Sequence, residues 1–349
     1  MKCVSAALLV LALVLVSDLA LGQSADPYRK FNEYRDAARA GRPYPGAPLR
    51  GKVIGFANIF GGPFTIAVEN GIKEQLRRAG LDLGKGWISM DNVGDPEIGL
   101  KNAQIMLKRK PDFFIEFQWY PEVNNQVASM FGKARIPVLA IDVPVPGAAF
   151  MGVDNHGVAL LAGHHMAKLI REKWGGWDGV DILVIDRLTT AGEAVEQRSE
   201  GVVEALAEEI GIAPDDPKIV RFDMDTNAEE FEGWGMKKVL EAHPDAVKIA
   251  LYGHNEPALK GMIAAMQSAG RWAPARKIAV SAGADEVGRR AIRDGLIDAA
   301  VAFFPERYGE YVVPAVCAAL TGNPVPPAIY VENEVITREN IDRWYPRKK

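Results

Sequence analysis

The chain has 349 residues, of which 48% are hydrophobic and 25% are charged, and this ordinary globular composition is enough for about two domains. Its formal net charge is −4, and no basic run is longer than the Lys-Arg-Lys of residues 108–110. The charge pattern therefore argues against a nucleic-acid-binding protein.

Residues 1–22 have the pattern of a secretory signal peptide. Lys2 precedes an apolar stretch over residues 6–16, and small residues end the segment at Gly22. An apolar stretch of this length is typical of a signal peptide and short for a membrane span, although a single N-terminal anchor helix is the alternative. We therefore expect cleavage near Gly22 and export of a soluble protein to the periplasm.

Cysteine usage agrees with export to a bacterial periplasm. Cys3 lies within the predicted signal peptide, so Cys317 is the only thiol left and no internal disulfide can form. Cys317 lies in the apolar run VVPAVCAAL, which favours a buried structural thiol over a nucleophile. A large exported chain without disulfides is more typical of the periplasm than of small secreted domains.

After the predicted signal, residues 23–50 are polar and rich in proline, so the sequence predicts a short helix at most, followed by a linker. From Lys52 onward, apolar segments typical of strands alternate with amphipathic helices. The predicted strands cover residues 53–58, 87–90, 112–117, 137–142, 149–153, 180–185, 218–222, 247–251, 277–281, 299–303 and 329–336. The predicted helices cover residues 64–79, 96–107, 123–134, 156–173, 193–210, 228–242, 257–269, 287–294 and 308–320.

This alternation predicts an α/β fold with parallel sheets. Buried strands rich in Val, Ile and Phe, separated by helices, are typical of sheets that helices cover on both faces. The units are too many for one compact domain, so we expect two doubly wound lobes. Ligands of such folds bind beyond the carboxyl ends of the strands, so the loops after the strands are the candidate site.

The first of these loops, residues 58–64, raises the possibility of a phosphate site. It lacks both the Gly-x-Gly-x-x-Gly pattern of dinucleotide-binding turns and the Gly-Lys-Ser/Thr end of a P-loop. Pro63 is better placed as the first residue of the following helix, where its missing N–H does no harm. We therefore favour the wall of a binding pocket over a phosphate cradle.

No catalytic or metal-binding pattern stands out elsewhere. His156, His164 and His165 share one predicted helix, but no carboxylate completes a known metal spacing, so ordinary histidines are the preferred interpretation. The sequence has no Gly-x-Ser-x-Gly elbow and no plausible Cys/His couple. We expect a protein that is not an enzyme and that needs no cofactor or metal.

Aromatic and polar side chains, in contrast, gather in the loops after the strands. These residues are Phe64, Trp119, Tyr120, Asp142, Arg198, Asn227, His254, Asn255 and Asp285. Rings that cover an apolar face, with a few polar groups at its rim, suit a small polar ligand. Taken singly, Asp142 could cap the turn before Pro144, and Arg198 could lie on a helix surface. Together they favour a binding pocket.

At this point the chain resembles the periplasmic ribose-type (type I) sugar-binding proteins of ABC transporters over most of residues 52–336. The resemblance is carried, in order, by Gly62-Pro63-Phe64, Ile136-Pro137-Val138, Ile141-Asp142, Val153-Asp154-Asn155, Gln197-Arg198-x-x-Gly201, Ala242-His243-Pro244-Asp245, Asn255-Glu256-x-Ala258-Leu259 and Arg293-Asp294-Gly295. It implies a monomer of two hinged lobes that closes on a small-molecule ligand and is recognised by a membrane permease. A sensing role at a membrane receptor is the alternative.

The resemblance also implies domain boundaries. The chain is expected to cross between lobes near Val153-Asp154, Phe303-Phe304 and Glu332-Asn333. After a signal peptide over 1–22 and an extension over 23–50, the implied lobe 1 is 51–153 plus 304–332. The implied lobe 2 is 154–303 plus 333–349.

Within the pocket, the resemblance places the stacking aromatic at Phe64, an aspartate at Asp142 and the sugar-binding arginine at Arg198. Other implied pocket positions are Gly62, Gln118, Asn227, His254, Gly283 and Phe303. Several of these depart from the ribose pattern. Where that pattern usually has Asn, this chain has Gly62 and His254. Where it has Asp, Gln and often Arg, this chain has Gly283, Phe303 and Val143, respectively. The changes predict a roomier and less polar pocket. We expect a polyol, a deoxy or modified sugar, or a less polar molecule rather than ribose.

Overall fold

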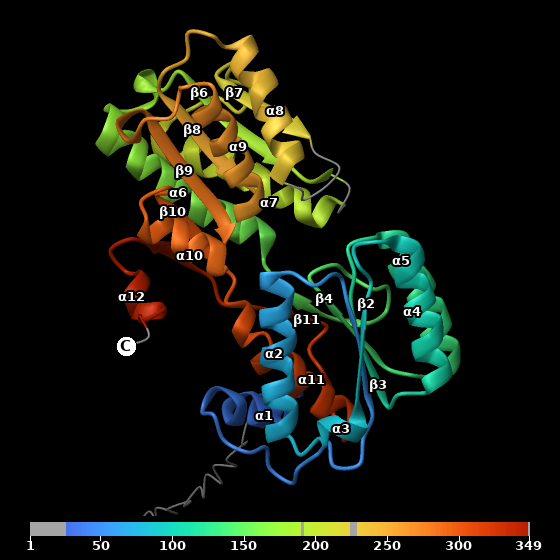
Figure 1. Cartoon of the computed structure of the whole chain (residues 1–349). Helices are drawn as coiled ribbons and strands as arrows, with labels where there is room; N and C mark the ends of the chain where they lie inside the picture. The colour runs from blue at the N-terminus through green and yellow to red at the C-terminus, as the bar shows by residue number, and fades with distance from the viewer. Residues whose placement is uncertain (1–25, 190–191, 224–228, 348–349) are drawn as a thin grey trace, which may run out of the picture.

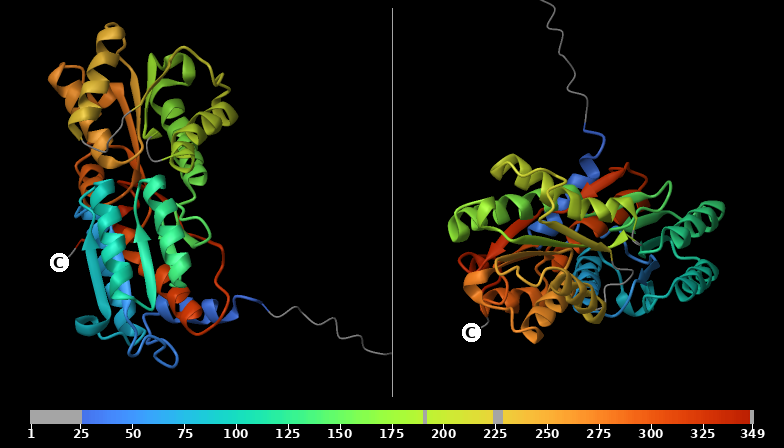
Figure 2. Two further views of the ribbon diagram at one scale, coloured as in Figure 1. Left: turned by 90° about the vertical axis from the view of Figure 1, so that its right-hand side faces the viewer. Right: turned by 90° about the horizontal axis from the view of Figure 1, so that it is seen from above.

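The computed structural model describes residues 26–189, 192–223 and 229–347 (Figure 1). Two six-stranded sheets form the centres of two lobes, which lie one above the other in Figure 1 and in the left view of Figure 2. All strand pairs are parallel except β10 with β12, which is antiparallel. The predicted fold class, two doubly wound parallel lobes, is confirmed.

Lobe 1 contains the sheet of order β11-β5-β4-β3-β1-β2. Its strands are β1 (Ile54–Asn58), β2 (Trp87–Asp91), β3 (Phe113–Phe117), β4 (Val138–Ile141), β5 (Ala149–Gly152) and β11 (Ala328–Tyr330). Its helices are α1 (Arg29–Arg39), α2 (Pro63–Arg78), α3 (Leu83–Gly86), α4 (Pro96–Arg109), α5 (Pro121–Ala134) and α11 (Gly309–Leu320). On β3, Phe114 packs with α4 and α5, whereas its neighbours Phe113 and Ile115 pack with α1, α2 and α11. Alternate side chains of one strand thus bury both faces of the sheet.

Lobe 2 contains the sheet of order β12-β10-β9-β8-β6-β7. Its strands are β6 (Ile182–Arg187), β7 (Ile219–Asp223), β8 (Ile249–Gly253), β9 (Lys277–Gly283), β10 (Ala299–Ala302) and β12 (Glu334–Thr337). Its helices are α6 (Asn155–Trp174), α7 (Glu193–Ile210), α8 (Glu229–Ala242), α9 (Glu256–Ser268), α10 (Glu286–Arg293) and α12 (Ile341–Trp344). Helices α6 and α7 cover one face of this sheet, and α8, α9 and α10 cover the other.

The chain passes between the two sheets three times. It passes from β5 to α6 at Val153-Asp154, from β10 to α11 through a short 3₁₀ helix at Pro305–Arg307, and from β11 to β12 through residues 331–333. The prediction of one last strand over 329–336 is therefore wrong, because β11 and β12 lie in different sheets. Asn333 marks the crossing, since its side-chain amide donates to the carbonyl of Ala302 at 2.9 Å.

Residues 26–50 are folded onto lobe 1, although the sequence predicts an extension with a linker. In α1, Phe31, Tyr34 and Ala38 are buried against α11. Leu49 is buried as well, and the Tyr44 hydroxyl lies 3.1 Å from the Gln75 side-chain oxygen. The polar average of this segment conceals apolar residues at helical spacing, which is enough to cover one face of lobe 1.

Two predictions concern the ends of the chain and its thiol. The predicted signal peptide lies outside the described residues. Within the part of the chain that the structure describes, no helix is long and apolar enough to cross a membrane. Cys317 is a buried free cysteine of α11, and burial raises the pKa of its thiol, as expected for a structural residue.

Candidate ligand-binding cleft

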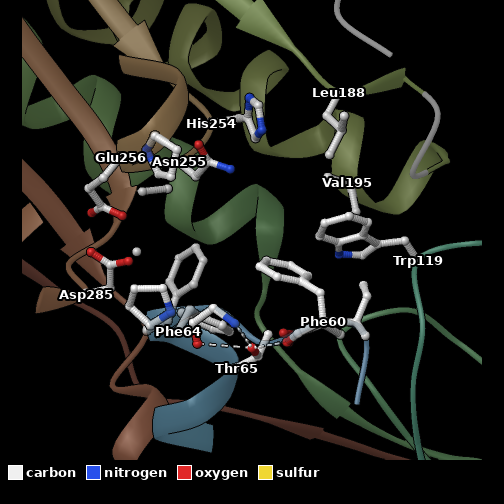
Figure 3. Close-up of a pocket in the computed structure, with 18 of the residues that line it drawn as sticks. Phe60, Phe64, Thr65, Trp119, Leu188, Val195, His254, Asn255, Glu256 and Asp285 are labelled. Atoms are coloured by element: carbon white, nitrogen blue, oxygen red, sulfur yellow. Dashed lines mark hydrogen bonds between the residues drawn. The ribbon is translucent and has the colours of Figure 1, made fainter. Parts of the chain in front are cut away.

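A cavity of about 230 Å³ lies between the lobes, at the carboxyl ends of strands from both sheets (Figure 3). From lobe 1 it is lined by Ile59, Phe60, Gly62, Pro63, Phe64, Thr65, Phe117, Trp119, Asp142 and Val143. From lobe 2 and the crossing strands it is lined by Leu188, Val195, Arg198, His254, Asn255, Glu256, Pro257, Ala282, Gly283, Asp285 and Phe303. Most of the predicted pocket residues therefore meet at one place.

The turn before α2 is a rigid part of the cleft wall. Gly62 is the N-cap of α2 and Pro63 its first residue, as predicted. The Thr65 hydroxyl accepts a hydrogen bond from the Gly62 N–H at 3.0 Å and donates back to the Phe60 carbonyl (Figure 3). These two hydrogen bonds restrain the turn and thereby the position of Phe64, the residue before Thr65.

Phe64 is held edge-on by two rings from the crossing segment. Its ring centroid lies 6.2 Å from that of Phe303 and 5.7 Å from that of Tyr308, with nearly perpendicular planes in both pairs. Edge-to-face contacts of this kind are favourable and orient the ring. Phe303, which is itself buried, thus acts as a support for Phe64 as well as lining the cavity.

Asp142 lies in the left-handed region of backbone space, at φ 59°, directly after β4. The Tyr308 hydroxyl donates to its carboxylate at 3.2 Å. Burial raises the pKa of Asp142 to about 6, and Arg198 and the Tyr308 hydrogen bond act in the opposite direction. Asp142 is therefore more than the cap of a turn, since its carboxyl group faces the cleft and is oriented by a second residue.

Arg198 is anchored at three points, so it is not a surface helix residue. Its Nε donates to the Asn155 side-chain oxygen at 2.8 Å, and its Nη1 donates to the His254 carbonyl at 3.3 Å. The guanidinium carbon also lies 4.9 Å from the centre of the Phe303 ring, within the range of a cation–π contact. These contacts hold a permanent positive charge at the junction of the lobes.

His254 is oriented by an aspartate that the sequence reasoning did not single out. Asp186, the fifth residue of β6, accepts a hydrogen bond from the His254 backbone N–H at 2.7 Å through Oδ1, and its Oδ2 pairs with the imidazole Nδ1. Both side chains are buried. The position of Asp186 at the end of a predicted buried strand was the available signal, because a carboxylate there needs a partner.

The two glycines that were expected to enlarge the pocket do not do so. A Cβ atom on Gly62 would lie 2.4 Å from Cε2 of Phe60, so the ring of Phe60 already fills that space. A Cβ atom on Gly283 would lie 2.4 Å from Oε2 of Glu256, so the carboxyl group of Glu256 fills the second space. Each missing side chain is replaced by a neighbour of the same protein.

Glu256 is consequently a pocket acid that the sequence reasoning missed. Its Oε1 accepts from the Ser281 hydroxyl at 3.2 Å and from the Ala284 backbone N–H. Burial and the nearby Asp285 raise the pKa of Glu256 to about 8, so the group is mainly protonated at neutral pH and can donate a hydrogen bond. Asp285 lines the cavity too, but its Oδ1 caps α10 by accepting from the Gly288 N–H at 3.0 Å.

Two predicted or candidate positions do not line the cavity. Gln118 is buried beneath it, with its side-chain oxygen accepting from the Trp119 N–H at 2.8 Å. The Tyr120 hydroxyl donates to the Gly94 carbonyl at 2.9 Å instead of facing the cavity. Asn227 lies outside the described residues.

Two of the three histidines of α6 lie beside glutamates of α7. His156 lies 2.7 Å from a carboxylate oxygen of Glu204 on α7, and His164 lies 3.3 Å from Glu209 on the same helix. Among the residues that the structure places, no group of His, Cys, Asp and Glu is arranged to hold a metal ion.

The fold and the cleft between the lobes define a type I solute-binding protein. The sequence profile of the periplasmic binding protein domain family matches residues 54–324, and the chain belongs to that family. This is a family of non-enzymatic solute-binding proteins, in agreement with the sequence-based expectation.

The chain is similar to proteins of known name. It is 22% identical over 281 residues to the ribose import binding protein of Salmonella typhimurium, covering 79% of this chain and 87% of that protein. A solute-binding protein from Bacillus halodurans, solved with bound myo-inositol, has a TM-score of 0.70 at 19% identity and covers 84% of this chain and 97% of that one. A Mycobacterium smegmatis solute-binding protein with bound glycerol has a TM-score of 0.72 at 19% identity, and the match covers 85% of this chain and 98% of that one. Similarity at this level establishes the fold.

Proposed function

We propose that the protein captures a sugar, polyol or modified sugar in the cleft between its lobes and delivers it to an ABC import permease from the periplasm. One observation carries the proposal: both lobes place oriented side chains on a single cavity. Phe64 and Trp119 come from lobe 1, and Arg198 and Glu256 come from lobe 2. The import proteins and sugar- or polyol-bound structures to which the chain is similar support this ligand class.

In this proposal the rings and the polar groups bind different parts of the ligand. Phe64 covers the C–H face of the ligand, as aromatic rings do in sites for polar molecules. Arg198 donates charge-assisted hydrogen bonds, Asp142 accepts them, and protonated Glu256 donates one. A ligand that contacts both sides binds the closed arrangement more tightly than the open one, so it shifts the lobes toward closure.

We do not expect ribose to be the ligand. Val143 and Phe303 offer no hydrogen-bonding group where the ribose pattern has polar side chains. A sugar hydroxyl buried against such a wall without a partner costs about 1–3 kcal/mol. We therefore propose a ligand with fewer hydroxyl groups at this side.

A thermal-shift screen of the purified protein tests the proposal. The panel contains ribose, glucose, galactose, allose, myo-inositol and glycerol. A true ligand at 100 times its dissociation constant adds about 2.7 kcal/mol to the free energy of unfolding and raises the melting temperature. Arg198→Ala removes the donors at the junction of the lobes and is expected to weaken binding by about 100-fold. Arg276→Ala, at an exposed residue far from the cleft, is the control.

Two results would count against this assignment. Absence of a shift with every compound of the panel, and with alkyl and aryl derivatives of these compounds, contradicts the ligand class. Full affinity in the Arg198→Ala variant contradicts the site.

A further inference from the structure

The cleft has a polar end and an apolar end. Figure 3 places Glu256 and Asp285 on one side and Leu188, Val195 and Trp119 on the other. Phe60 lies between them, against the ring of Trp119. The polar end can hydrogen-bond to the hydroxyl groups of a sugar or polyol, whereas among the described residues of the apolar end only the indole N–H of Trp119 can do so.

Among the residues that the structure describes, Leu188 and Val195 do not pack into the core of lobe 2. They form a small cluster of their own, separate from the three large clusters of buried residues. Leu188 directly follows β6, and Val195 lies in the first turn of α7. Because these side chains line the cavity, their apolar surface serves the cleft rather than the stability of the lobe.

The opposite wall of the apolar end comes from lobe 1. The rings of Phe60 and Trp119 have centroids 5.1 Å apart with their planes tilted by 53°. The Thr65 hydroxyl bonds to the carbonyl of Phe60, which restrains the backbone that carries this ring. Four apolar side chains from two lobes therefore enclose one end of the cavity.

We infer that the ligand is amphipathic: a sugar or polyol head that carries an apolar substituent, such as an aryl or alkyl aglycone. The identity of the head rests on the proposed function. The substituent would lie between the Phe60–Trp119 pair and Leu188 with Val195. An unsubstituted sugar would instead place hydroxyl groups against Phe60, Leu188 and Val195, none of which offers a hydrogen-bonding side chain.

Matched derivatives test this inference. Isothermal titration calorimetry compares the methyl and phenyl derivatives of each panel compound, together with the free compounds. For the recognised head, the phenyl derivative is expected to bind about tenfold tighter or more than the methyl derivative, because it buries additional apolar surface. Equal affinity of the two derivatives overturns the inference and leaves the proposed function intact. Binding by none of the free compounds or derivatives overturns the proposed function itself.

Variants of the apolar end locate the effect. Val195→Thr changes a methyl to a hydroxyl at nearly constant volume and is expected to lower phenyl-derivative affinity about fivefold while leaving methyl-derivative affinity unchanged. Leu188→Asn is a second variant with the same expected pattern. Val247→Thr, at an exposed valine of lobe 2 outside the cavity, is the control. A loss that is equal for both derivatives in both cleft variants overturns the placement of the substituent.

Discussion

Lobe 1 presents mainly rings to the cleft, whereas lobe 2 presents a hydrogen-bonded set of charged and polar groups. In lobe 1, the short turn before α2 carries Phe60 and Phe64, and only Asp142 is ionisable. In lobe 2, Arg198 and Glu256 are fixed by several partners each. Aromatic rings bind a flat face of a ligand, and hydrogen bonds fix the orientation of its polar groups. Because each lobe supplies mainly one of these, neither lobe holds a complete site. We expect tight binding only when the two surfaces meet.

The largest expected effect comes from breaking the buried network of lobe 2. Asp186→Ala removes the acceptor of two His254 hydrogen bonds and is expected to lower the free energy of unfolding by about 3 kcal/mol. Urea denaturation measures the change. Asp178→Ala, at an exposed aspartate of the same lobe, is the control. A loss no larger than that of the control would show that the pair does not organise lobe 2.

A second prediction uses two buried glutamates, one in each lobe. Burial raises the pKa of Glu256 and of Glu116 to about 8 in each case, well above the ordinary value for glutamate. Both groups keep their proton in the folded protein at a pH where the unfolded chain has lost it. The stability they contribute is therefore fully present at about pH 4 and is lost as the pH rises to about 8. We expect the free energy of unfolding to fall over this window, at about 1.4 kcal/mol per pH unit for each of the two groups.

The two glutamates differ in their relation to the cleft. Glu256 lines the cavity, whereas the carboxylate of Glu116, inside β3, has no hydrogen-bond partner among the described residues. Glu256→Gln and Glu116→Gln should each reduce the pH dependence, as measured by denaturation at several pH values. Only Glu256→Gln should change ligand affinity. If both variants changed ligand affinity, a position inside the cavity would not be what distinguishes Glu256 from Glu116.

The smallest expected effect lies in the turn of lobe 1. Thr65→Val keeps the volume but removes the hydroxyl that bonds to Gly62 and Phe60, and is expected to cost about 1 kcal/mol of stability. Thr321→Val, at an exposed helix end, is the control, and thermal denaturation measures both. If the two variants have equal stability, the Thr65 bonds do not stiffen the turn.

The periodicity of the sequence and the positions of the strand ends were sufficient to predict the two sheets and several residues of the cleft. The alternation of strands and helices predicted two parallel sheets, and the loops after the strands predicted that Phe64, Asp142 and Arg198 would meet. These features depend on neighbours in the sequence, on the twofold period of strands and on the rule that parallel strands end at one edge.

The remaining features depend on contacts between distant residues. Phe60 and Glu256 fill the spaces at Gly62 and Gly283. A glycine in a sequence does not show which neighbouring side chain takes the space beside it. The expectation of an extension with a linker failed at residues 26–50 for a different reason. Their polar average concealed the few apolar positions, such as Phe31 and Leu49, that attach them to lobe 1.

In the proposed function, one ligand bridges the two lobes. Small-angle X-ray scattering of the purified protein, with and without a saturating concentration of the panel compound that gives the largest thermal shift, tests it most directly. We predict a smaller radius of gyration with ligand in the wild-type protein and no change in Arg198→Ala under the same conditions. An unchanged radius in wild-type protein that calorimetry shows to be saturated would contradict the account.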